Sequence, residues 1–421
     1  MKKLKKLSLN LLLLIFCLTL LFPFAFAKES QGERLGNFNN PKGRVFSCAK
    51  RGDVRFFPEN SAEGIRFCAE QGIDIVQIDL KKTKDDKYIL MKDDTLERMA
   101  VKRDGSSSKV KVKDETLENI KKNYILKDGH GGPLSKPTKL TVSSFEEAID
   151  IAKDRCILLV DIDFNEAQNI NNIVKNKAAT DFVILRGAKT PQEVDKYIKS
   201  AGVPACPISS VYNDNTKGSA KKFVDGSIEA GANCITLISS KNGMSSFKKK
   251  TINALKDKGR AIVDMSDPKL CGGLEDNEKG WENVIRSGFG IIETDYSVEL
   301  AEYLRQTTNK RANLMSLIQN AESLNINTYS NDSAKHLSET LKKAKDDTEN
   351  LKTPLSEIKQ SSYDLQEAIY NLQIRTKADE DKERNKVIII VSFLAVFVIV
   401  LGGYFLFRKR PPKKNKKVKQ K

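Results

Sequence analysis

The sequence predicts an α/β protein: a closed parallel (β/α)8 barrel (TIM barrel), then a small three-helix bundle and one transmembrane helix. Three observations predict this. Short apolar runs alternate with amphipathic segments from Arg44 onward, several runs end in charged residues, and apolar residues take helical spacing after residue 310. Strands that alternate with helices and carry polar residues at their carboxyl ends are typical of this barrel. A chain of 421 residues has room for it and for smaller modules.

The barrel is expected over residues 44–308, with its strands at the apolar runs. The predicted strands cover residues 44–49, 73–79, 156–163, 181–186, 205–211, 233–238, 260–264 and 289–293. The predicted helices lie near residues 60–71, 144–153, 190–201, 217–231, 245–258 and 277–287. The second strand is followed by an insertion, in which a Gly-rich loop carries His130.

The two ends of the chain predict export and anchoring. Residues 1–27 have a basic start, an apolar centre and a small-x-small ending, which is typical of a signal peptide. Residues 28–43 are polar and are expected to be a linker. Residues 387–407 carry no charge and are long enough to span a bilayer. The basic tail 408–421 follows at once and is expected in the cytoplasm, so the other domains would be extracellular.

Residues 311–374 have apolar residues at helical spacing in three segments, which predicts the helical bundle. The segment resembles the FIVAR module of bacterial cell-surface proteins, with Tyr329-Ser330 between two of its helices. A plain stalk that lifts the barrel from the surface is the alternative. Residues 375–386 form a charged linker before the transmembrane segment.

The net charge of +17 does not indicate a nucleic-acid surface. Four of the positive charges lie in the signal peptide and nine in the tail, and subtracting these thirteen leaves +4 for the rest. Six of the seven cysteines lie in the exported part, where disulfides could form. They fall in or beside apolar runs, so we favour small unpaired core residues.

The stretch 45–98 holds the candidate site. It contains Lys50-Arg51-Gly52, then Pro58-Glu59-Asn60, then Gln77 and Asp79 at the end of an apolar run, then Lys92-Asp93 before Leu96 and Arg98. This order and spacing resemble the glycerophosphodiester phosphodiesterase family. The family pattern has His at the positions of Lys50 and Lys92, and Glu at the position of Gln77.

The resemblance implies cleavage of a phosphodiester next to glycerol, in which one His accepts a proton and the other donates one. Lys50 and Lys92 occupy these catalytic positions. A lysine has an ordinary pKa near ~10.4 and can donate a charged hydrogen bond, but it cannot accept a proton at neutral pH. Strong burial or a neighbouring positive charge could lower that pKa. His130 is a second, weaker candidate for an acid–base group.

The resemblance also implies a divalent cation such as Mg²⁺ or Ca²⁺. Its candidate ligands are Gln77, Asp79 and one of Asp161 and Asp163, which share a face of the third strand. The loss of one carboxylate predicts weak binding at best. The alternative, which we favour slightly, is that these carboxylates form ion pairs with Lys50 or Lys92.

These observations favour a membrane-anchored, catalytically degenerate relative that binds phosphodiester or polyol-phosphate groups. Cell-envelope polymers would be suitable partners. The phosphate ligands would be Lys50, Arg51, Glu59, Asn60 and Lys92, with the three cationic side chains converging on one phosphate. There are two alternatives. One is an active hydrolase of lipid metabolism with altered catalytic residues, and the other is a surface scaffold or adhesin with an idle cleft.

Overall fold

The computed structural model describes residues 30–106, 109–215, 218–240, 247–255 and 257–408, with the side chains of 31, 393 and 395–408 left out. The predicted signal peptide and all of the basic tail after Arg408 lie outside the described residues. The described chain divides into two compact units. The first comprises Met1–Lys310 with Asn350–Glu357, and the second comprises Arg311–Glu349 with Ile358–Lys421.

The first unit is a closed barrel of parallel strands, as the apolar runs predict. Each strand pairs in parallel with the next around the barrel, and β1 closes it by pairing with both β11 and β2. The strands are β1 (Phe46–Ala49), β2 (Ile75–Lys82), β6 (Ile157–Asp161), β7 (Val183–Ala188), β8 (Ile208–Asn213), β9 (Cys234–Ile238), β10 (Arg260–Asp264) and β11 (Ile291–Thr294). Their side chains are almost all buried, as expected for strands that lie between a barrel interior and covering helices.

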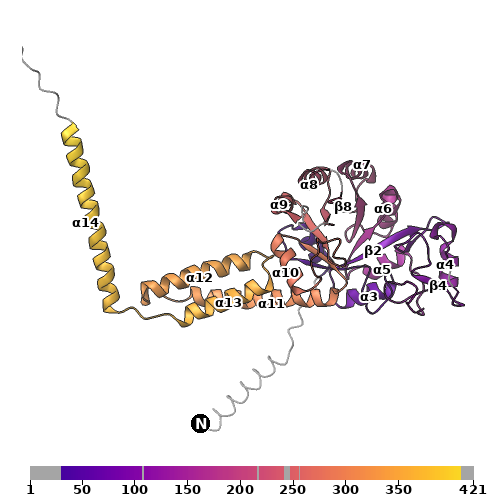
Figure 1. The fold of residues 1–421 in the computed structure, drawn as a ribbon, viewed down its shortest axis with the longest axis horizontal. Coiled ribbons are helices and arrows are strands. Elements are labelled where there is room, and N and C mark those ends of the chain that lie inside the picture. Colours follow the sequence, from indigo (N-terminus) through magenta and orange to yellow (C-terminus); the bar gives the residue numbers. More distant parts are fainter. Residues whose placement is uncertain (1–29, 107–108, 216–217, 241–246, 256, 409–421) are drawn as a thin grey trace, which may run out of the picture. The chain divides into compact units, whose positions relative to one another are not determined.

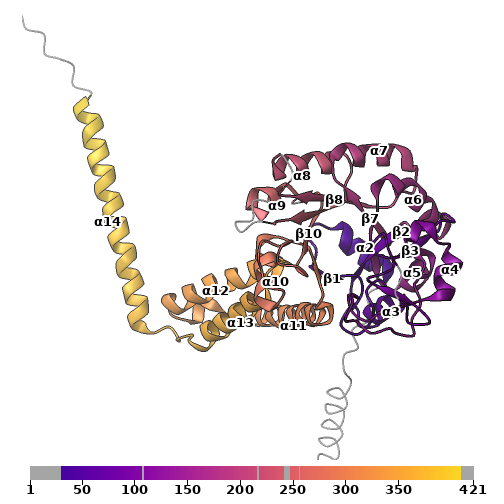
Figure 2. The same ribbon diagram turned by 45° about the vertical axis from the view of Figure 1, so that its right-hand side comes forward.

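One helix follows each barrel strand and covers the outside of the barrel (Figures 1 and 2). Local sequence fixes several starts: Ser144 and Glu147 form a capping box at α5, and Thr190 and Glu193 form another at α7, where Pro191 is the first residue. The helices are α3 (Ala62–Glu70), α5 (Phe145–Ala152), α6 (Ala167–Asn176), α7 (Pro191–Ala201), α8 (Ala220–Glu229), α9 (Lys249–Leu255), α10 (Glu278–Ser287) and α11 (Ser297–Glu322). Part of the predicted helix 245–258 lies outside the described residues.

The insertion between β2 and α5 forms a small layer beside the barrel. Strand β3 (Tyr88–Leu90) pairs antiparallel with the end of β2, and β4 (Ala100–Lys102) pairs with β5 (Tyr124–Leu126). A short helix, α4 (Leu117–Asn123), lies between them, with Thr116 as its N-cap. A separate apolar cluster that includes Leu96, Ile120 and Val142 supports this layer. The loop that carries His130 therefore belongs to a layer with its own apolar core.

The structure differs from the prediction at residues 28–43, where a polar linker was expected. Helix α2 (Gln31–Asn39) forms there, with a capping box between Ser30 and Glu33. Its Phe38 is buried in the barrel core. The guanidinium of Arg260, from β10, donates to the carbonyls of Asn37, Phe38, Asn40, Arg44 and Gly290. The segment is therefore held to the amino-terminal end of the barrel.

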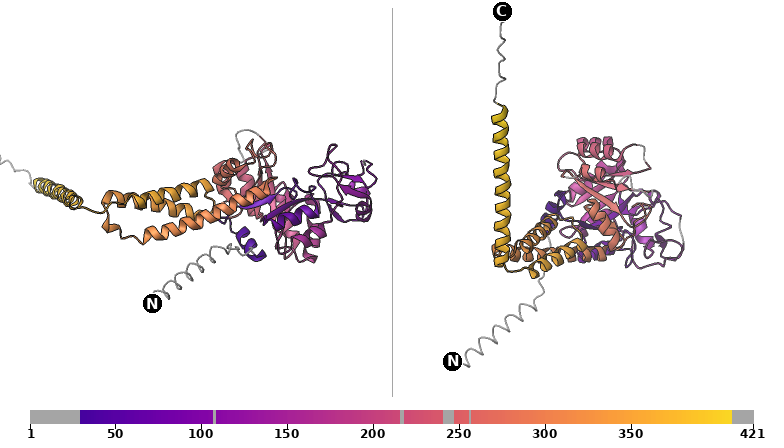
Figure 3. Two further views of the ribbon diagram at one scale, coloured as in Figure 1. Left: turned by 90° about the horizontal axis from the view of Figure 1, so that it is seen from below. Right: turned by 60° about the vertical axis from the view of Figure 1, so that its left-hand side comes forward.

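The second unit has its own apolar core. It contains the end of α11 with α12 (Asn331–Glu349) and α13 (Leu355–Tyr370), which run side by side (Figure 3). Leu314, Leu337, Ala344, Ile358 and Leu365 are buried in this core, at positions where the helical spacing predicted apolar contacts. The FIVAR resemblance of this segment stays a prediction.

Helix α14 (Lys377–Arg408) includes most of the predicted charged linker and the whole uncharged segment 387–407. Among the helices of the described chain, none combines the length and apolarity needed to cross a membrane.

The described chain holds six cysteines, which are all buried and none of which forms a disulfide there: Cys48, Cys68, Cys156, Cys206, Cys234 and Cys271. They act as small core residues.

Candidate functional site

Strand register brings charged residues together at the carboxyl ends of the barrel strands. Asp79 of β2 lies opposite Asp161 of β6, which in turn lies opposite Arg186 of β7. On the other side of the barrel, Asp264 of β10 lies opposite Glu293 of β11. Lys50 follows β1, whose neighbours are β2 and β11. The result is a ring of buried charges at the mouth of the barrel, where (β/α)8 proteins carry their sites.

Lys50 is enclosed by two carboxylates of this ring. Its ammonium nitrogen lies 2.6 Å from Asp264 Oδ2 and 2.6 Å from Glu293 Oε1, and the residue is only 8% exposed. Burial alone would lower the pKa of Lys50, but the Asp264 and Glu293 carboxylates hold that pKa above its usual range. Lys50 therefore stays protonated at neutral pH.

Arg186 is the second buried cation of the ring. Its guanidinium binds both oxygens of Asp161 and both oxygens of Glu293, with Nη2 3.1 Å from Asp161 Oδ2 and 3.1 Å from Glu293 Oε1. Burial alone would raise the pKa of Glu293, but Arg186 and Lys50 outweigh it and lower that pKa to about 2. Glu293 is thus an anion shared by two cations. The prediction from sequence missed Arg186, although it is the charged residue at the end of the apolar run 181–186.

Asp79 organises the second half of the site. Its Oδ2 accepts hydrogen bonds from Arg51 Nε at 3.0 Å and Asn60 Nδ2 at 3.1 Å, and its Oδ1 accepts one from Lys92 Nζ at 2.9 Å. Burial raises the pKa of Asp79, but Lys92 and Arg51 outweigh it and hold that pKa well below its usual range. The pair between Asp79 and Lys92 agrees with the ion-pair alternative that we favoured.

Arg51 and Asn60 both have left-handed backbone conformations, with φ of 54° and 58°. Residues other than glycine are uncommon in this region and are often found at functional sites. The backbone N–H of Asn60 donates to the carbonyl of Arg51 at 2.8 Å, which links the two residues. The loop therefore directs both side chains onto Asp79.

Glu59 joins this half of the site to the loop of the insertion. Its buried carboxylate accepts from Arg51 Nη1 at 3.0 Å and Arg98 Nη2 at 2.5 Å, and Nδ1 of His130 lies 2.9 Å away. The other ring nitrogen of His130 lies 3.3 Å from Asp295 Oδ2. The hydrogen bonds to Asp295 and Glu59 raise the pKa of His130 to about 9, so His130 is charged at neutral pH.

The predicted metal ligands do not fit a divalent cation in this arrangement. Both oxygens of Asp79 and both oxygens of Asp161 accept bonds from cationic side chains. The Gln77 side-chain carbonyl accepts from the backbone N–H of Arg51, and Asp163 caps its own turn through Asn165. Across the described ranges, no group of three or more His, Cys, Asp or Glu side chains could hold a metal ion.

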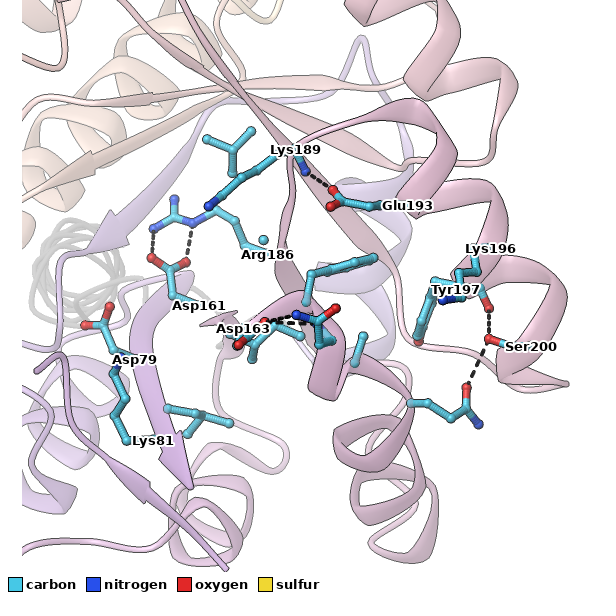
Figure 4. Close-up of a pocket in the computed structure, with 18 of the residues that line it drawn as sticks. Asp79, Lys81, Asp161, Asp163, Arg186, Lys189, Glu193, Lys196, Tyr197 and Ser200 are labelled. Atoms are coloured by element: carbon cyan, nitrogen blue, oxygen red, sulfur yellow. Dashed lines mark hydrogen bonds and ion pairs between the residues drawn. The ribbon is translucent and has the colours of Figure 1, made fainter. Parts of the chain in front are cut away.

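A cavity of about 600 Å³ opens beside this ring. It lies at the ends of β2, β6 and β7 and against α7 (Figure 4). Its charged lining residues are Asp79, Lys81, Lys92, Asp161, Asp163, Arg186, Lys189, Glu193 and Lys196. Of the predicted phosphate ligands, Lys92 lines it, whereas Arg51, Glu59 and Asn60 are not among its lining residues. Lys50 contacts Asp264 and Glu293 and does not line this cavity, whereas Arg51 and Lys92 both bind Asp79. The convergence of all three cationic side chains on one phosphate stays a prediction.

Comparison with known sequences finds one family that part of the chain resembles. The sequence model of the glycerophosphoryl diester phosphodiesterase family matches residues 51–206. The glycerophosphodiester phosphodiesterase of Bacillus subtilis (strain 168) is 32% identical over 114 residues, which are 27% of this chain and 36% of that protein. The enzyme of the same name from Caldanaerobacter subterraneus subsp. tengcongensis is 35% identical over 74 residues, 18% of this chain and 28% of that protein. The chain thus spans about a third of the length of these relatives.

Comparison with solved structures supports the fold. A glycerophosphoryl diester phosphodiesterase from Parabacteroides distasonis ATCC 8503 superimposes with a TM-score of 0.52 and 20% identity, over 65% of this chain and 90% of that chain. At this identity the likeness concerns the barrel architecture alone.

Proposed function

We propose that the protein binds phosphodiester or polyol-phosphate groups without the ordinary turnover of the glycerophosphoryl diester phosphodiesterase family, whose sequence model matches residues 51–206. The observation that carries the proposal is the enclosure of Lys50 between Asp264 and Glu293. Where the family resemblance expects a proton acceptor, this chain has a permanently charged ammonium group.

The acid–base argument extends to His130. General acid–base catalysis works best with groups whose pKa lies near the working pH. Lys50 has a pKa above its usual range and His130 has one of about 9, so both are protonated at neutral pH. Neither can accept the proton of an attacking water or hydroxyl. Lys92 forms an ion pair with Asp79, and its charge can also stabilise a bound anion.

Binding of an anion is supported by Lys92, whose side chain is 43% exposed and lines the cavity. The carboxylates at the cavity already accept bonds from Arg51, Lys92 and Arg186, which reduces their repulsion of a phosphate. Hydrogen bonds to charged groups contribute about 1.5–3 kcal/mol each. After the cost of immobilising a small ligand, a single phosphodiester should bind no tighter than about micromolar.

The proposal includes a location at the outside of the cell membrane. Its support is the sequence: a signal peptide at residues 1–27, the uncharged segment 387–407 and the basic residues after it. Many anchored copies facing one envelope polymer with repeated phosphates would bind it by avidity, which compensates for weak single contacts.

A surface scaffold or adhesin with an idle cleft is the second candidate. The observation that favours it is the extent of internal pairing. Lys50, Arg51, Lys92 and Arg186 all have carboxylate partners. On this view the ring stabilises the barrel and has no ligand.

One experiment separates these functions from the active hydrolase. The full-length chain is assayed for hydrolysis of glycerophosphodiesters with Mg²⁺, Ca²⁺ or chelator, beside the Bacillus subtilis relative as positive control. Binding of the same compounds is then titrated for wild type, Lys92→Ala and Lys87→Ala, an exposed lysine before β3 that does not line the cavity. We expect no hydrolysis and saturable binding that only Lys92→Ala weakens. Metal-stimulated turnover would establish the hydrolase, and absence of binding would leave the scaffold.

A further inference from the structure

The α7 side of the cavity carries two lysines that form no ion pairs with the ring of buried charges. Lys189 follows β7 and Lys196 lies on α7, and both are exposed and line the cavity (Figure 4). Among the described side chains, none lies within 4.0 Å as an ion-pair partner for either ammonium group. Lys199, one turn from Lys196, is by contrast paired with Asp195 at 2.6 Å.

The acidic residues around the cavity are engaged elsewhere. Both oxygens of Asp79 and of Asp161 accept from cationic side chains, as described above. Asp163 Oδ1 accepts from the backbone and side chain of Asn165. Glu193 Oε2 accepts from the backbone N–H groups of Lys189 and Thr190 in the α7 capping box. One oxygen of Asp163 and one of Glu193 are thus held by neighbouring donors, whereas the ammonium groups of Lys189 and Lys196 have no ion-pair partner among the described side chains.

The cavity is also larger than one phosphodiester group requires. Its volume of about 600 Å³ falls in the middle of the range for whole drug-sized ligands. Lys92 and Asp79 lie at the β2 side, and Lys189 and Lys196 lie at the α7 side, with Arg186 lining the space from β7. A ligand that carries charge at one point would leave one of these two sides without a partner.

We infer that Lys189 and Lys196 form a second anion subsite, so that the cavity takes a chain with repeated phosphates rather than a single diester. This inference rests on the proposed function, because it assumes that one phosphate lies near Lys92. The ligand class is a polyol-phosphate oligomer, whose phosphates are separated by short neutral linkers. Negative charges spaced along a flexible chain match cations at both sides of the cavity.

The test compares two ligands on four forms of the full-length chain. The ligands are glycerophosphoglycerol, with one phosphodiester, and a short synthetic oligomer of glycerol phosphate, both titrated by calorimetry. The proteins are wild type, Lys92→Ala, the double variant Lys189→Ala/Lys196→Ala, and the control Lys199→Ala. Lys92, Lys189, Lys196 and Lys199 are all exposed, so these variants should fold, and their thermal unfolding is checked against wild type.

We expect the oligomer to bind wild type more tightly than the monomer. The double variant should bind the oligomer about three- to tenfold more weakly, since two exposed ion pairs are lost, and should bind the monomer as wild type does. Lys199→Ala should change neither ligand. Lys92→Ala should weaken both.

Each of the following results would overturn the inference. If the double variant keeps full affinity for the oligomer, or loses affinity for both ligands equally, no separate subsite exists on α7. If wild type binds the monomer but gains nothing from the oligomer, the proposed function stands and this inference fails. If neither ligand binds, the proposed function fails as well.

Discussion

Replacing Arg186 with methionine should destabilise the barrel strongly at neutral pH. The change keeps an unbranched side chain of similar length but removes the guanidinium that binds Asp161 and Glu293. Glu293 is fully buried and Asp161 is largely so, and Lys50 is then the remaining cation for Glu293. Removing one partner of a buried ion pair typically costs about 3–5 kcal/mol, because the other charge is left without compensation.

The pKa of Glu293 gives a separate figure. Its value of about 2, against an ordinary 4.5, corresponds to about 3 kcal/mol of stabilisation of the charged form. This lowered pKa means that the contribution is present above pH 4.5 and is lost as the pH falls toward 2. The difference between wild type and Arg186→Met should therefore be largest at neutral pH and shrink below pH 4.5.

Tryptophan fluorescence provides the assay. Trp281 is the only tryptophan of the chain and is buried in the apolar core of the barrel unit, so its emission follows the unfolding of that unit. Urea titrations at pH 7 and at pH 4 would give the free energy of unfolding for wild type and variant.

The second variant, Arg186→Met/Glu293→Gln, supplies the control. Removing the stranded charge should recover more than about 1 kcal/mol of the loss, since a neutral amide is less costly to bury than an unpaired carboxylate. A loss below about 1 kcal/mol for Arg186→Met, equal at both pH values, would refute the description of the ring as a set of buried ion pairs.

Three further predictions concern other parts of the first unit. The pKa of His130 is about 9, against an ordinary 6.5, so the charged imidazole contributes its full stabilisation below pH 6.5 and loses it as the pH rises to 9. Wild type should therefore lose stability between pH 6.5 and 9, and His130→Asn should lose less over that range. Equal pH profiles for the two proteins would contradict this. Arg260→Met should leave several buried carbonyls unsatisfied, cost about 2–4 kcal/mol and expose α2 to limited proteolysis, whereas an unchanged digestion pattern would exclude this anchor. Lys50→His should not restore metal-stimulated hydrolysis, because acid and base act as a unit; measurable turnover by this single variant would disprove that dependence.

The barrel could be predicted from sequence because its strands are buried on both sides. Such strands appear as continuous apolar runs of a few residues, and all eight runs became barrel strands. Helix α2 was missed because its sequence is polar and contains glycine and asparagine. The signals that could have found it are the capping box of Ser30 and Glu33 and the apolar Phe38 that packs on the core.

The partners of the site residues could not be predicted in the same way. The sequence places Lys50 and Asp79 at the ends of strands, but it does not say which charges meet across the barrel. Lys50 was expected to face a phosphate, Asp79 or Asp161, and the structure shows it in contact with Asp264 and Glu293. That outcome depends on strand register around the closed barrel and on side-chain direction, which are set by contacts between residues more than 200 positions apart.

The ring of charges also ties together strands that are not neighbours. Arg186 connects β7 to β11, and three strands lie between these two along the barrel wall. Local opening of one strand end would break ion pairs that cross the interior of the barrel, as well as the hydrogen bonds to its neighbours. The backbone amide hydrogens at the carboxyl ends of β7 and β11 should therefore exchange with solvent only when the whole unit unfolds. This end of the barrel would then hold a bound ligand in a rigid site.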